Sequence, residues 1–146
     1  MIYLDTNFFL FANFDKTTRG ENAWRLQQKI ISGEKAMTSA LTLDEVMWVI
    51  IKNKRKAALR ETVEDIYAMP NLAIREISAS APLDALALME QFDLKPRDAF
   101  HVAVMKTTGT NDIVSDDPDF DRVKGIKKEF DYDPRTQLMA SIDIEC

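Results

Sequence analysis

The sequence begins with Met1-Ile-Tyr-Leu-Asp5-Thr6-Asn7, where a short, mostly apolar run ends abruptly in three polar residues. An apolar run of this length predicts a buried β-strand over residues 1–4. Asp, Thr and Asn accept the free N–H groups at the start of a helix, and the apolar segment 8–14 that follows predicts one or two helical turns. The stretch therefore predicts a strand that passes directly into a helix, with a carboxylate at the junction.

The same alternation of strands and helices continues along the chain. Further strands are expected over residues 35–39, 72–77, 112–115 and 126–130, and further helices over residues 19–32, 43–53, 56–69, 82–92, 96–107 and 118–123. This order predicts an α/β fold, a Rossmann-like three-layer sandwich with a central parallel sheet of about five strands and helices on both faces. In such folds, ligands bind beyond the carboxyl ends of the strands, near the point where the strand order reverses.

Length and composition suit one globular domain. The chain has 146 residues, of which 46% are hydrophobic, which is enough for a packed core and too many for a disordered chain. No apolar run approaches the roughly 20 residues of a membrane-spanning helix, and the N-terminus lacks the basic segment of a signal peptide. Cys146 is the single cysteine, which excludes an internal disulfide. A cytoplasmic protein without a membrane segment is expected.

The charge distribution is uneven. The formal net charge is -5, whereas nucleic-acid-binding proteins usually present a basic surface. Basic residues nevertheless gather in one run, Lys52-Asn53-Lys54-Arg55-Lys56. A run of this kind is either a solvated helix end or a surface for a nucleic-acid backbone, and the sequence favours neither reading.

Four acidic residues lie at the expected starts of four different helices: Asp5, Glu45, Asp98 and Asp117. Each has a purely structural explanation. Asp5 and Asp117 suit helix caps, Asp98 is a favourable first-turn charge after Pro96, and Glu45 can form a capping box by reaching back to the backbone amide of Thr42.

Taken together, the four acids indicate more than helix capping. The segments after Glu45 and Asp98 are strongly apolar, so these helices are expected to be largely buried and their first-turn acids partly so. A buried carboxylate must pair, take up a proton or bind a cation. Carboxylates that converge at one edge of a sheet repel one another, and a divalent cation removes that repulsion. Oxygen ligands without cysteine or a second histidine select Mg²⁺ or Mn²⁺ over zinc.

These residues resemble a known family in their order and spacing. The segments 1–7 and 97–101, with Glu45 between them and the segment 113–121 after them, are similar to the PIN domain, most of all to its VapC-type toxin ribonucleases. The resemblance extends from residue 1 to about residue 130. A nuclease domain is therefore expected over residues 1–130, and residues 131–146 are expected to form a tail that packs on the domain or on a partner.

The resemblance implies an enzyme, a Mg²⁺- or Mn²⁺-dependent endoribonuclease that hydrolyses RNA phosphodiester bonds. It also implies a PIN-like fold and the role of toxin in a toxin–antitoxin pair, with a small antitoxin as partner and a homodimer as assembly. The catalytic acids are then Asp5, Glu45, Asp98 and Asp117, with Asp5 and Asp98 as direct metal ligands. The supporting residues are Thr6, Asn7, Ser115, Asp116 and Asp119. The candidates for weak contacts with the RNA backbone are Lys52, Lys54, Arg55, Lys56 and Arg97.

Some residues keep two interpretations. His101, the sole histidine, shares a helix face with Asp98, and a hydrogen-bonding place in the wall of the site or the core is favoured over a catalytic role. Arg97 either contacts phosphate or pairs with a neighbouring acid. The apolar run 8–11 and the region of Trp48 are typical of a core. The run is nevertheless too continuous for one buried helix face, so part of it is expected to be exposed for self-association or for a partner.

Two other classes of protein fit parts of the pattern. A Mg²⁺-dependent phosphatase could use Asp5 as a nucleophile, but such enzymes usually carry a second Asp two residues later, where this chain has Asn7. A non-catalytic PIN-like module that binds RNA or protein is the other alternative, and the presence of all four acids counts against it.

Overall fold

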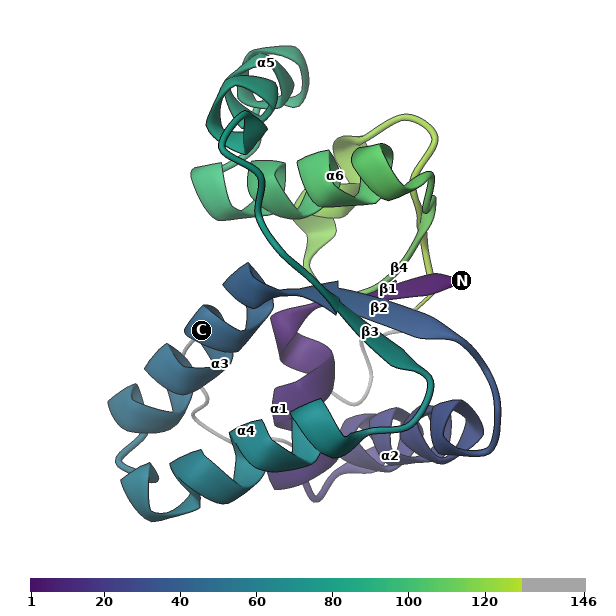
Figure 1. Cartoon of the computed structure of the whole chain (residues 1–146), viewed down its shortest axis with the longest axis vertical. Helices are drawn as coiled ribbons and strands as arrows, with labels where there is room; N and C mark the ends of the chain where they lie inside the picture. Colours follow the sequence, from purple (N-terminus) through teal and green to yellow (C-terminus); the bar gives the residue numbers. More distant parts are fainter. Residues whose placement is uncertain (130–146) are drawn as a thin grey trace.

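The computed structural model describes residues 1–129 and has three layers, a central parallel sheet with helices on both of its faces (Figure 1). The strands are β1 (Ile2–Leu4), β2 (Ala36–Ser39), β3 (Leu72–Arg75), β4 (Asp112–Val114) and β5 (Lys127–Lys128). The helices are α1 (Thr6–Phe14), α2 (Thr18–Ile31), α3 (Ala40–Lys52), α4 (Leu59–Ala68), α5 (Ala81–Phe92) and α6 (Pro96–Thr108), with short 3₁₀ segments η1 (Lys56–Ala58) and η2 (Pro118–Arg122). The predicted fold class is confirmed.

Side chains alternate across the sheet and so build two cores. In β1, Leu4 contributes to a core with α1 to α4, whereas Tyr3 contributes to a core with α5 and α6. The neighbouring strand β4 repeats the pattern with Val114 and Ile113. Figure 1 shows the consequence, with α5 and α6 on one side of the sheet and α1, α2 and α4 on the other. A buried parallel sheet of this kind needs apolar residues on both faces.

The strand order places the site. It runs β3-β2-β1-β4-β5, and all neighbouring pairs are parallel. The chain moves outward from β1 to β2 and β3, and then returns to the other side of β1 for β4 and β5. The strand order therefore reverses between β1 and β4, where Asp5 follows one strand and Ser115 the other. The backbone amide of Asp5 still donates to the carbonyl oxygen of Val114, at 3.2 Å.

The boundary of one helix was predicted wrongly. The helix expected over 43–53 begins at Ala40, directly after β2, so Glu45 lies in its second turn and not in its first. The segment expected as a helix over 56–69 is a 3₁₀ turn followed by α4. The tail predicted over residues 131–146 lies outside the described residues.

The interpretation of the run 8–11 as part of the core is confirmed, whereas the expected exposure of part of this run and the expected burial of Trp48 were wrong. The run Phe8, Phe9, Leu10 and Phe11 is entirely buried, because α1 lies between the sheet and the helices α2 and α3 and so has apolar neighbours on nearly every side. Trp48, expected in the core, is 53% exposed on the outer side of α3. Within residues 1–129, no helix combines the length and the apolar character needed to cross a bilayer.

Candidate active site

Four elements bring the predicted acids to the edge of the sheet where the strand order reverses. Asp5 follows β1 and caps α1, and Asp117 follows β4 and caps η2. Glu45 comes from α3, and Asp98 from the first turn of α6. The structure therefore gathers the four acids from positions far apart in the sequence, as the parallel sheet predicts.

Asp5 is the most buried of these acids and is held at both oxygens. Its Oδ1 accepts a hydrogen bond from the backbone N–H of Thr6 at 2.7 Å, and its Oδ2 accepts one from the Ser115 hydroxyl at 2.6 Å. Burial raises the pKa of the Asp5 carboxyl, and His101 and the hydrogen bonds from Ser115 and Thr6 counteract part of that rise. Asp5 is thus a fixed carboxylate, oriented before any ligand binds.

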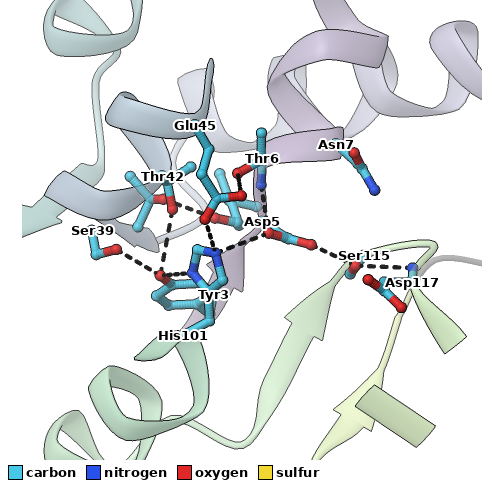
Figure 2. A network of polar contacts seen from close by, with 12 residues as sticks. Tyr3, Asp5, Thr6, Asn7, Ser39, Thr42, Glu45, His101, Ser115 and Asp117 are labelled. Carbon is cyan, nitrogen blue, oxygen red and sulfur yellow. Dashed lines mark hydrogen bonds and ion pairs between the residues drawn. The ribbon is translucent and has the colours of Figure 1, made fainter. Parts of the chain in front are cut away.

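Glu45 is also held at both oxygens, but by side chains. Its Oε2 accepts from the Thr6 hydroxyl at 3.1 Å, and its Oε1 lies 2.9 Å from Nε2 of His101. The capping box proposed for Glu45 and Thr42 is absent, because Thr42 is the third residue of α3 and its hydroxyl is buried near the Tyr3 hydroxyl. Glu45 therefore points into the site and away from its own helix start (Figure 2).

Asp117 and Asp119 form the wall of the site on the β4 side. The Ser115 hydroxyl accepts from the backbone amide of Asp117 at 3.1 Å, and Oδ1 of Asp117 accepts from the backbone amide of Asp119 at 2.9 Å. Ser115 thus joins the Asp117 turn to Asp5. The Arg122 guanidinium pairs with the Asp119 carboxylate at 2.9 Å, which compensates one of the negative charges.

Asp98 lies close to other carboxylates of the site. Burial, followed by the like charges of Asp117 and Asp5, raises its pKa from 3.8 to about 7. Ligand oxygens of Asp98, Asp117 and Asp119 all lie within 4.8 Å of one another. Because every donor in this group is a carboxylate oxygen and the charges repel, the group fits a hard divalent cation such as Mg²⁺ or Mn²⁺.

His101 lies in the wall of the site, buried and doubly hydrogen-bonded. Its Nδ1 is 2.7 Å from the Tyr3 hydroxyl, and its Nε2 is 2.9 Å from Glu45 and 3.5 Å from Asp5 Oδ1 (Figure 2). Burial opposes the charged imidazolium, but Tyr3, the hydrogen bond to Glu45 and the charge of Asp5 raise the pKa of His101 well above its ordinary value of 6.5. The favoured interpretation, a hydrogen-bonding residue in the wall, agrees with this geometry.

The remaining supporting residues lie at the periphery. The Asn7 side-chain amide donates to Asp116, and Arg19 lies 3.8 Å from the other oxygen of Asp116. Burial is the main cause that raises the pKa of Asp116, and Asn7 and Arg19 counteract part of it. Arg19 also pairs with Asp15 at 2.7 Å, so it lies between the end of α1 and the loop after β4.

The basic residues do not enter the carboxylate cluster. The side chains of Lys52, Lys54, Arg55 and Lys56 are exposed at and beyond the end of α3. Arg97 is exposed as well, and within residues 1–129 it forms no ion pair, so the proposed pairing with a neighbouring acid is not observed there.

Sequence reasoning missed three residues of this site. Tyr3, Ser39 and Thr42 are fully buried and meet at the Tyr3 hydroxyl, which donates to the Ser39 hydroxyl at 2.9 Å. One signal was available. Tyr3 and Asp5 are two residues apart at the end of a strand, and such residues point to the same face of a sheet.

Comparison with known proteins identifies the architecture. Residues 2–126 match the sequence model of the PIN domain. Ribonuclease VapC13 of Mycobacterium tuberculosis is 29% identical over 131 residues, which cover 88% of this chain and 98% of that protein. The structure of VapC20 of M. tuberculosis, described as a sarcin–ricin loop cleaving toxin, has a TM-score of 0.70 at 22% identity, covering 83% of this chain and 93% of that one. A chain from a toxin–antitoxin complex of Klebsiella pneumoniae has a TM-score of 0.64 at 20% identity, covering 90% and 100%.

Proposed function

This chain belongs to the PIN domain family, and from that premise we propose that it is a metal-dependent endoribonuclease of the VapC type. The observation that carries the proposal is the convergence of Asp5, Glu45, Asp98 and Asp117 at the point where the strand order reverses. The similarity to VapC ribonucleases, which covers 98% of their length, supports the choice of RNA as substrate.

The chain's own acids would hold the metal. Asp98 and Asp117 supply neighbouring oxygens, and Asp5, the second ligand expected from the sequence, lies beside them as one of the charges that raise the pKa of Asp98. A bound Mg²⁺ or Mn²⁺ supplies a water of lowered pKa and neutralises charge on the scissile phosphate.

The fixed residues of the site orient this chemistry. Ser115 and the Thr6 amide hold the Asp5 carboxylate, and the Thr6 hydroxyl and His101 hold Glu45, so both acids are placed before RNA binds. Such preorganisation lowers the cost of orienting groups during the reaction. We assign to Glu45 and Asp117 the role of completing the site that binds the metal and the attacking water. Attack by a water oxygen on phosphorus breaks the bond to the 3′ oxygen and leaves a 5′-phosphate and a 3′-hydroxyl.

RNA would extend beyond the acids toward cationic side chains. The exposed basic residues Lys52, Lys54, Arg55 and Lys56 follow the helix that carries Glu45, and Arg97 precedes Asp98 in sequence. Lysine and arginine bind the phosphate backbone without reading sequence. An RNA substrate places the expected site of action in the cytoplasm.

The biological role proposed is that of a toxin held by an antitoxin. Several of the similar solved structures are described as toxin–antitoxin or VapBC complexes. This chain exposes large apolar side chains suited to a partner protein or to a second copy in a homodimer: Trp24, Ile31, Trp48, Leu83 and Leu86. Exposed apolar groups of this size often mark protein interfaces.

Cleavage of a mixed pool of structured and single-stranded RNAs tests the function. The purified protein is expected to cut RNA in Mg²⁺ or Mn²⁺ and to stop in EDTA. Asp5→Asn and Asp98→Asn are expected to abolish cutting while their folds survive, and Asp65→Asn, at an exposed position of α4, serves as the matched control. Undiminished cleavage by both site variants would refute the assignment.

A further inference from the structure

A histidine lies between two acids of the site, Glu45 and Asp5. Nε2 of His101 lies 2.9 Å from Glu45 Oε1 and 3.5 Å from Asp5 Oδ1, and the imidazole is 1% exposed. An ionised carboxylate only accepts hydrogen bonds, so Nε2 must carry the proton that Glu45 receives. The imidazole therefore acts as a fixed donor at the base of the site.

A tyrosine holds that histidine from behind. The Tyr3 hydroxyl lies 2.7 Å from Nδ1 of His101 and donates to the Ser39 hydroxyl at 2.9 Å. The two rings meet edge to face, with centroids 5.6 Å apart. Tyr3 has no exposed surface, and Ser39 is equally buried, so the imidazole has little freedom to turn. A hydrogen bond to the second ring nitrogen is the usual device that fixes the orientation of a histidine.

The topology explains why these residues meet. Tyr3 and Asp5 leave β1 toward the same face of the sheet, and α6 crosses that face with His101 one turn after Asp98. Glu45 extends from α3 on a long side chain, and its other carboxylate oxygen accepts from the Thr6 hydroxyl at 3.1 Å. Asp5 and Glu45 also repel each other, and the N–H of His101 lies between them.

We propose that Tyr3 and His101 are positioning residues that fix the Glu45 carboxylate against Asp5 (Figure 2). The proposal rests on the proposed function only for its effect on catalysis. Its structural content, a Tyr3–His101–Glu45 chain of hydrogen bonds, stands without it. Without the Tyr3 hydroxyl, the His101 imidazole is free to turn and no longer fixes the Glu45 carboxylate. The chemical step is then slower, while RNA binding is unchanged.

Tyr3→Phe is the decisive variant because it removes one hydroxyl and keeps the buried ring. We expect kcat to fall by about ten- to a hundredfold with little change in KM, the range seen when groups that orient a metal ligand are removed. Tyr67→Phe makes the same change at an exposed position of α4 and is expected to leave both constants unaltered. In a Glu45→Gln background, Tyr3→Phe is expected to cause no further loss, since its effect passes through Glu45. An equal loss in both backgrounds, or none in the wild type, overturns the proposal.

A readout without RNA separates this inference from the proposed function. His101 is the sole histidine, so ¹⁵N-labelled protein gives a single set of imidazole signals in NMR spectra. In metal-free wild type, we expect a slowly exchanging Nε2 proton that is lost in Glu45→Ala and exchanges faster in Tyr3→Phe. Wild type that shows this signal but cuts no RNA contradicts the nuclease and keeps the network. An Nε2 signal that is unchanged in both variants contradicts the network, whatever the activity.

Discussion

Replacing Asp98 with Asn is expected to stabilise the metal-free protein above neutral pH while it abolishes cleavage. The pKa of Asp98 is raised from 3.8 to about 7, first by burial and then by the charges of Asp117 and Asp5. The folded protein therefore keeps a proton that the unfolded chain releases near pH 3.8. Stability falls as pH rises between these two values, and the penalty is complete above about pH 7. Asparagine has no charge to desolvate and so escapes the penalty.

The two pKa values set an upper limit on the effect. The difference between 3.8 and about 7 corresponds to about 4 kcal/mol, at roughly 1.4 kcal/mol for each pH unit. Asp98 is only partly buried, so water screens its interactions and reduces this figure. We expect Asp98→Asn to be more stable than the wild type by about 1–2 kcal/mol at pH 8, and by almost nothing at about pH 4.

Urea unfolding in EDTA measures this difference at both pH values, with Asp65→Asn on the exposed side of α4 as a control that should follow the wild type. Addition of Mn²⁺ should then stabilise the wild type and leave Asp98→Asn almost unchanged, because ligand binding to the folded state raises its stability. If the variant is less stable than the wild type at pH 8 without metal, the Asp98 carboxylate is stabilised by the protein itself and needs no cation.

Three further outcomes are expected. Alanine at the four basic residues of the run 52–56 should reduce the slope of log KM against log salt concentration by up to about three, at roughly 0.7 for each lost phosphate contact. An unchanged slope would show that the run does not bind RNA. Gly20→Ala should lower unfolding free energy in urea by about 3 kcal/mol, because its Cβ would lie 1.8 Å from the backbone oxygen of Asp15; a loss below about 1 kcal/mol contradicts this packing. Ser115→Ala removes a buried hydroxyl that donates to Asp5 and should cost about 1–2 kcal/mol of stability in the same assay and about tenfold in kcat; wild-type values of both would show that Asp5 is oriented without Ser115.

The sequence was sufficient for the strands and for the two acids that follow them. Asp5 comes directly after a short apolar run, and Asp117 follows another with Ser115 and Asp116 between them. The structure makes both acids helix caps as well as members of the cluster. Helix capping and membership of the carboxylate cluster are therefore not competing explanations for these two acids. The residue after a central parallel strand lies at the ligand edge of the sheet because of topology alone, and the helix start there favours an acid.

Glu45 shows where local patterns fail. The motif Thr-x-x-Glu predicts a helix start at Thr42, but β2 passes into α3 at Ala40 without a side-chain cap, and Thr42 is buried near Tyr3. No rule of spacing within α3 reveals that Glu45 receives hydrogen bonds from Thr6 and from a histidine 56 residues later.

The expectation that part of the apolar run of α1 is exposed was wrong for a related reason. Continuous apolar residues contradict a helix with one buried face, and this led to the expectation of exposed residues between Phe8 and Phe11. The helix instead follows the central strand and is covered by the sheet, α2 and α3. A helix that is apolar on every side is simply buried on every side. Trp48 is the converse, since α3 covers the core with one face only and leaves that ring outside.

The site divides into a part that the fold completes and a part that it leaves unfinished. Asp5 and Glu45 have hydrogen-bond donors at all four carboxylate oxygens, from Thr6, Ser115 and His101. Asp98 lies beside them, and burial and the like charges of Asp117 and Asp5 raise the pKa of its carboxyl group. A fully satisfied cluster would leave nothing for a cation to gain on binding. The unfavourable charge at Asp98 is expected to lower the stability of the metal-free protein, and we propose that the same charge gives the site its affinity for a metal.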